Sequence, residues 1–165
     1  MTPYEELLQT ADNSGITVLE HDFRGNARGI YCDGIVILNK NCSTVEKYCT
    51  LAEELGHHHT ASSNIIELDT LDKRKQELLG HRWGIDRLLP LPSIIDTLIA
   101  NRCEDLIQLA ELLEVTPEYL QEALGYYKQK YGARIDHEGY CIILDDASLV
   151  VWPVVEEMES NIFFE

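Results

Sequence analysis

A β-hairpin signal that runs directly into a capped helix is the feature that most limits how this chain can fold. Two β-rich runs flank Asp33-Gly34, a dipeptide that favours a two-residue hairpin turn. Ser43 then opens a capping box that Glu46 completes, which predicts a helix extending to about His59. Strands followed at once by a helix indicate an α+β domain, in which a small antiparallel sheet packs on that helix.

The rest of the pattern predicts further helices and a second hairpin near the C-terminus. Ser93 is expected to cap one helix after Pro90 and Pro92. The other expected helices span residues 2–13, 71–89, 104–113 and 117–130, and the expected β segments span 16–20, 29–32, 35–39 and 134–144. Residues 61–72 read as a loop, and the tail from residue 156 onward fits none of these patterns.

The charge of the chain restricts its partners. The 165 residues carry a formal net charge of −16, while 45% are hydrophobic, enough for an ordinary globular core. Acidic groups repel phosphate backbones and anionic lipid surfaces, so neither is an expected partner. Two interpretations of the charge stay open: a solvated acidic surface, and attraction to a basic protein.

Cysteine usage and the N-terminus predict a cytoplasmic protein. The cysteine count is odd and contains no Cys-x-x-Cys pair, which argues against a disulfide framework. The first residues lack the basic and apolar regions of a signal peptide, and no apolar run approaches the roughly 18 residues of a membrane span.

Three residues of the predicted helix after the hairpin have the spacing of a zinc-peptidase motif. Glu53 and His57 are four apart, so both can point at one atom, and Glu54 lies about 100° round the helix. This is the arrangement of His-Glu-x-x-His with its first histidine replaced by glutamate. In such a motif the flanking residues bind the metal, and the middle glutamate is the general base that takes a proton from water.

Two other interpretations of this segment remain. Glu54 and His58 are also four apart, but that register puts Leu55 in the position of the base, giving a metal pair without a catalyst. The whole cluster could also be a polar helix end, because histidines near a helix C-terminus are favoured by the helix dipole alone.

A third metal ligand is expected on the next long helix, because catalytic zinc usually has three protein ligands and an open position. Glu77 and His81 lie four apart there, on one face. Glu77 is the predicted ligand. His81 is left with three roles: an outer partner of a ligand, an alternative ligand, or a donor to the transition state.

The segment 51–58, Leu-Ala-Glu-Glu-Leu-Gly-His-His, resembles the ImmA/IrrE family of metallopeptidases, which are often encoded by phages and mobile elements. The similarity extends over most of the chain. Further matching segments lie at 29–39, 75–77, 82–83, 88–90, 109–113 and 115–120.

The resemblance implies a zincin-like, gluzincin-type core in residues 1–91 and a helical region with a C-terminal hairpin in 92–165. It implies Zn²⁺ held by Glu53, His57 and Glu77, with Glu54 as base. The spacing of the residues leaves His58 and His81 as outer or alternative ligands. The implied function is an endopeptidase acting on a protein, such as a helix-turn-helix repressor. The alternative is a weak or inactive zincin-like module that binds a regulatory protein.

Glutamate at position 53 makes the expected site unusual. Two carboxylates and a neutral imidazole leave a formally neutral site around Zn²⁺, whereas two histidines and one carboxylate would leave it at +1. A less positive site acidifies water less, which predicts a slow or selective peptidase. An oxygen-rich ligand set also shifts preference towards Mn²⁺ or Fe²⁺.

Residues 106–124 read as two short helices around a tight turn, a pattern also found in DNA-binding proteins. The second helix carries Glu118 and Glu122 and has no basic residue before Lys128. Phosphate contacts need basic groups. We therefore expect a structural helix pair or a protein-docking surface, and no nucleic-acid-binding residues.

Overall fold

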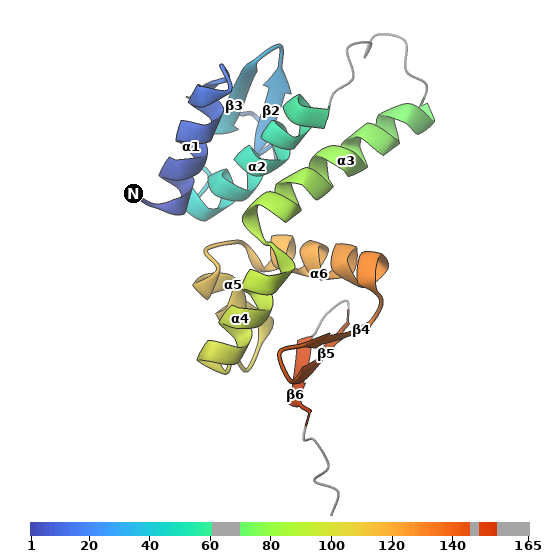
Figure 1. Ribbon diagram of the computed structural model, residues 1–165. Coiled ribbons are helices and arrows are strands. Elements are labelled where there is room, and N and C mark those ends of the chain that lie inside the picture. The colour runs from blue at the N-terminus through green and yellow to red at the C-terminus, as the bar shows by residue number, and fades with distance from the viewer. Residues whose placement is uncertain (61–69, 146–148, 155–165) are drawn as a thin grey trace, which may run out of the picture.

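The computed structural model describes residues 1–60, 70–145 and 149–154 (Figure 1). The described residues form six helices and six strands, which confirms the α+β class. The helices are α1 (Pro3–Asn13), α2 (Thr44–Thr60), α3 (Thr70–Leu88), α4 (Leu91–Asn101), α5 (Leu106–Leu112) and α6 (Pro117–Tyr131). The strands are β1 (Thr17–His21), β2 (Gly29–Cys32), β3 (Ile35–Asn39), β4 (Arg134–His137), β5 (Tyr140–Leu144) and β6 (Leu149–Pro153).

The first sheet has the strand order β1-β3-β2. β2 and β3 form the expected antiparallel hairpin, and its turn residues Asp33 and Gly34 both have positive φ, as a type I′ turn requires. The expectation of an entirely antiparallel sheet is wrong for β1, which pairs parallel to β3. Residues 22–28 carry the chain past the position of β3 to the far edge, so β3 enters between the two earlier strands.

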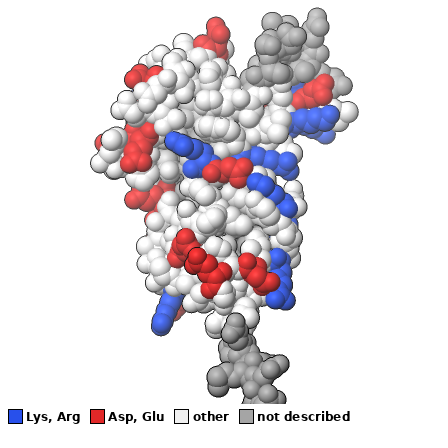
Figure 2. All heavy atoms as spheres, in the orientation of Figure 1, with Lys and Arg blue, Asp and Glu red and all other residues white. Residues whose placement is uncertain are grey.

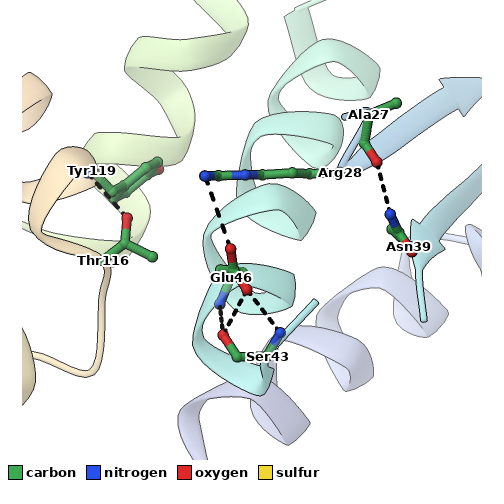
Figure 3. A network of polar contacts seen from close by, with 7 residues as sticks. All are labelled: Ala27, Arg28, Asn39, Ser43, Glu46, Thr116 and Tyr119. Carbon is green, nitrogen blue, oxygen red and sulfur yellow. Dashed lines mark hydrogen bonds and ion pairs between the residues drawn. The ribbon is translucent and has the colours of Figure 1, made fainter. Parts of the chain in front are cut away.

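α2 lies between this sheet and α3, with a different face towards each (Figure 1). Leu51 and Leu55 are fully buried in the core formed with α1 and the sheet. The helix begins with the predicted capping box, in which the Ser43 hydroxyl accepts from the Glu46 amide and the Glu46 carboxylate accepts from the Ser43 amide (Figure 3). The cap fixes where α2 starts and hence which residues face α3.

The second half of the chain contains α4, α5, α6 and a second sheet of order β4-β5-β6. The predicted hairpin of β4 and β5 is present, while the third strand, β6, was not predicted. The expected Ser93 cap is wrong. α4 begins at Leu91, has Pro90 in the cap position without a side-chain cap, and carries Pro92 in its first turn, where its lack of an N–H costs nothing.

Two hydrophobic clusters hold the fold together. One joins α1, the first sheet and α2, and the other joins α4, α5, α6 and β5. The second cluster also contains Cys49 of α2, Ile85 of α3 and Leu89 directly after α3. Because Trp83 and Leu88 of α3 pack on the first cluster, α2 and α3 contribute to both. The division at residues 91/92 therefore stays a prediction.

Two expectations concern residues that are only partly described or not described. In the expected loop 61–72, residues 61–69 lie outside the described residues and 70–72 already belong to α3. The tail from residue 156 onward also lies outside them. Among the described helices, none combines the length and the apolar character needed to cross a bilayer.

Candidate metal centre

The site lies where α2 and α3 run alongside one another. Gly56 faces Gly80, and a Cβ built on Gly56 would overlap the Gly80 carbonyl group. This close approach places the residues that flank each glycine against the other helix. The result is two side-chain pairs, one helical turn apart, which join the helices: His57 with Glu77, and Glu53 with His81.

The first pair has the separation of two ligands on one ion. His57 Nε2 and Glu77 Oε2 are 3.4 Å apart, longer than a good hydrogen bond. Two atoms bound tetrahedrally to zinc at about 2.0–2.1 Å lie about 3.4 Å from one another. The Glu77 side chain is 74% exposed, so it is not buried in other contacts and is open to an ion.

The second pair extends to a third residue. His81 Nδ1 lies 2.9 Å from Glu53 Oε1, and His81 Nε2 lies 3.0 Å from Glu122 Oε2 of α6. The ligand atoms of these three residues all lie within 4.8 Å of one another. In this conformation Glu53 thus joins His81 and Glu122 rather than His57 and Glu77. Hydrogen bonding to Glu53 raises the pKa of His81, although burial opposes that shift.

Glu54 lies on the sheet side of α2. A Cβ on Gly29 of β2 would be 3.5 Å from Glu54 Cγ, which places the Glu54 side chain beside that strand. Burial raises the pKa of Glu54, while the nearby charge of His57 lowers it to a smaller extent. A carboxylate whose pKa is raised towards neutrality is suited to act as a general base.

The other two histidines of α2 have separate partners. His58 Nδ1 is 2.8 Å from the Tyr31 hydroxyl, which also accepts from the Gly34 amide at the hairpin turn. His59 stacks on Trp83 of α3, with ring centroids 4.5 Å apart. His57 and His59 contact α3 and His58 contacts β2, so this helix end is not simply a solvated polar cluster.

A cavity of about 470 Å³ opens beside these residues. Its walls include Ile30 and Tyr31 of β2, Glu54 and His57 of α2, and Glu77 of α3. Glu54 and the His57–Glu77 pair therefore face the same space, whereas the contact of His81 with Glu122 lies on the side of α6. A substrate in the cavity would reach Glu54 together with two of the candidate ligands, His57 and Glu77, whereas Glu53 is not among the residues that line it.

The residues present fit a divalent metal ion. His57 and Glu77 supply a nitrogen and an oxygen donor at a suitable separation. Glu53, the third predicted ligand, contacts His81 through Oε1 in this conformation. Zinc accepts both imidazole nitrogens and carboxylate oxygens, and a set of one nitrogen and two carboxylate oxygens has one histidine fewer than the set with two histidines and one glutamate.

Comparison with known proteins agrees with this geometry. A family model described as the IrrE N-terminal-like domain, Peptidase_M78, matches residues 11–124. The chain belongs to this metallopeptidase family. The match confirms the ImmA/IrrE resemblance and makes this a domain of metallopeptidase type, whose members carry a metal, typically zinc. No individually curated protein matches the chain.

Three residues at the site were not singled out from the sequence. Tyr31 is not part of any spacing typical of metal ligands. Its position just before the hairpin turn is the one sequence feature that could have predicted its place at the site. From the sequence, Glu122 is informative only as an acidic residue whose charge opposes DNA binding. Tyr119, 4% exposed, packs edge-on against the His81 ring, and its hydroxyl has no hydrogen-bond partner in the described part of the chain.

Proposed function

We propose that this chain is a zinc-dependent endopeptidase whose ion is held by Glu53, His57 and Glu77, with Glu54 as the general base. The observation that carries the proposal is the His57–Glu77 pair, whose ligand atoms are spaced for one ion at the wall of a cavity that Glu54 shares. Membership of a metallopeptidase family supports the same assignment.

The bound ion would supply Lewis acidity, which lowers the pKa of water and polarises the scissile carbonyl group. Glu54 takes the proton from the attacking water and passes it to the leaving amine. Glu54 lies beside β2, and burial there raises the pKa of its carboxyl group. His81 holds one oxygen of Glu53 and restricts how that carboxylate can turn.

An extended segment of protein is the substrate that suits the cavity. β2 forms one wall and is an edge strand of the sheet, because its only sheet partner among the described strands is β3. A peptide could add to this edge through main-chain hydrogen bonds, which position a chain without demanding one sequence. Ile30, 47% exposed at this edge, offers an apolar contact for a substrate side chain.

We place the enzyme in the cytoplasm, with a helix-turn-helix repressor of a phage or mobile element as its target. Family membership supports a protein substrate, and the repressor is the implication of the ImmA/IrrE resemblance. The replacement of the usual first histidine by Glu53 favours one alternative: a weak or inactive module that binds the same regulator without cleaving it.

Glu54→Gln tests the catalytic claim, because it removes the base while keeping the size of the side chain. The zinc-loaded wild type is expected to cleave a repressor encoded beside its gene, as followed by mass spectrometry of the products. The variant is expected to bind zinc equally and to lose at least about 100-fold in rate. Equal cleavage by both proteins would refute the role of Glu54, and binding of the repressor without cleavage would favour the alternative.

A further inference from the structure

His81 lies between two carboxylates that come from different helices. Its Nδ1 contacts Glu53 at 2.9 Å and its Nε2 contacts Glu122 at 3.0 Å. Each ring nitrogen of His81 therefore faces one carboxylate oxygen, so the imidazole spans the gap between α2 and α6. In this arrangement His81 links Glu122 to Glu53 through its two ring nitrogens.

The start of α6 fixes Glu122 in place. The Thr116 hydroxyl accepts from the Tyr119 amide, and Pro117 occupies the first turn, so the helix begins at a defined residue (Figure 3). Tyr119 and Glu122 are three apart and share one face. The Tyr119 and His81 rings pack edge to face with a centroid distance of 6.0 Å. Two residues of α6 therefore contact the imidazole: Tyr119 through its ring and Glu122 at Nε2.

We propose that Glu122 is a positioning residue: through His81 it fixes the orientation of Glu53 for metal binding. The inference rests on the proposed function, in which Glu53 is a ligand. It extends that function to α6, a helix that the sequence predicts to be part of a structural helix pair or a protein-docking surface. Outer partners that orient a metal ligand are typically worth about 10–100-fold in metal affinity or activity.

Zinc affinity of the full chain, measured by competition with a chelating dye, tests the proposal. Glu122→Ala is expected to weaken affinity about 10–100-fold without changing the stoichiometry of one ion per chain. Glu122→Gln keeps an acceptor for His81 Nε2 and is expected to recover part of the loss. Glu118→Ala removes the same charge from an exposed position one turn earlier on α6 and is expected to leave affinity unchanged.

A double-mutant cycle separates positioning from a general effect of charge. In a His81→Ala background, Glu122→Ala is expected to have no further effect on zinc affinity, because Glu122 acts on Glu53 only through the His81 ring. The proposal would be overturned if the losses of zinc affinity in His81→Ala and Glu122→Ala were fully additive. It would also be overturned if Glu122→Ala bound zinc as tightly as Glu118→Ala. Complete loss of the ion in Glu122→Ala at every zinc concentration would also overturn it, by making Glu122 a ligand.

A measurement on the metal-free chain separates this inference from the proposed function. In nitrogen-15 NMR of the histidine side chains, Glu122→Ala is expected to change the His81 Nε2 signal more than the His81 Nδ1 signal, because only Nε2 contacts Glu122. An unchanged His81 spectrum would refute the link to Glu122 even if zinc binds. If the wild type binds no zinc, the proposed function fails, and the spectrum still decides whether Glu122 holds His81.

Discussion

Glu53 is the residue that sets the character of the site. It stands where a related metallopeptidase motif has histidine, and its carboxylate is shared with His81 in the structure. With Glu77 it would bring two negative charges to one divalent ion, which reduces the acidifying effect of that ion on water. A slow peptidase is the consequence that we expect from this single residue.

The variant Glu53→His tests that consequence. It restores the usual two-histidine ligand set and leaves a formal charge of +1, so zinc binding is expected to tighten and hydrolysis to rise. Chelator competition and the cleavage rate of the repressor are the two measurements. A variant in which neither quantity increases would show that Glu53 does not contact the ion.

The sequence was informative about single residues where local spacing decides their position. Glu53, Glu54 and His57 share one helical turn, so their faces follow from helix geometry alone, and Glu77 follows from the same rule on α3. The contact of His81 with Glu122 could not be predicted in this way. It depends on how α6 packs against α3, and no periodicity within either helix specifies that packing.

At the scale of the elements, the contact between α2 and α3 makes the site. Gly56 and Gly80 meet without side chains, and a Cβ on Gly80 would lie 2.7 Å from His57 Nδ1. Any larger residue would push the helices apart and separate His57 from Glu77. The narrow contact is thus a condition for the ligand separation of 3.4 Å.

Gly56→Ala is expected to destabilise the chain by about 1–3 kcal/mol, as overpacking of a close contact does, and to weaken zinc binding. Gly125→Ala is the matched control, since Gly125 lies inside α6 and a Cβ there meets nothing within 4 Å. The control is expected to gain about 0.5–1 kcal/mol from better helix propensity. Thermal and denaturant unfolding give both values, and equal stability of the two variants would contradict the close contact.

Local signals predicted the elements better than their pairing. The Ser43–Glu46 capping box of α2 and the Asp33-Gly34 turn are short-range features, and each lies where the sequence predicts it. The parallel pairing of β1 with β3 and the addition of β6 to β5 join segments through long-range contacts. Such strand pairing depends on how segments distant in the sequence pack in the core. Local sequence patterns do not determine that packing.

At the scale of the whole molecule, the acidic balance governs which partners can approach. On the face shown in Figure 2, lysine and arginine side chains stand among acidic ones rather than forming a continuous basic surface. The helix pair α5–α6 carries Glu118 and Glu122 on its second helix, and Glu122 is engaged with His81. The pair therefore contacts the site through Glu122 and lacks the basic residues that a DNA-binding helix pair needs.

A mobility-shift assay at low salt tests this interpretation. No saturable binding to duplex DNA is expected, because the net charge of −16 opposes phosphate contacts. The helix-turn-helix repressor proposed as substrate would serve as the positive control on its own operator. Tight, saturable binding by the chain itself would make α6 a DNA-contacting element.

Zinc-loaded crystals provide the most direct test of the central claim, the identity of the metal ligands. Anomalous diffraction at the zinc edge is predicted to place one ion within about 2.0–2.2 Å of His57 Nε2 and of carboxylate oxygens of Glu53 and Glu77. Glu54 is predicted to face the open coordination position. An ion bound instead by Glu53, His81 and Glu122, or no ion between α2 and α3, would contradict the account.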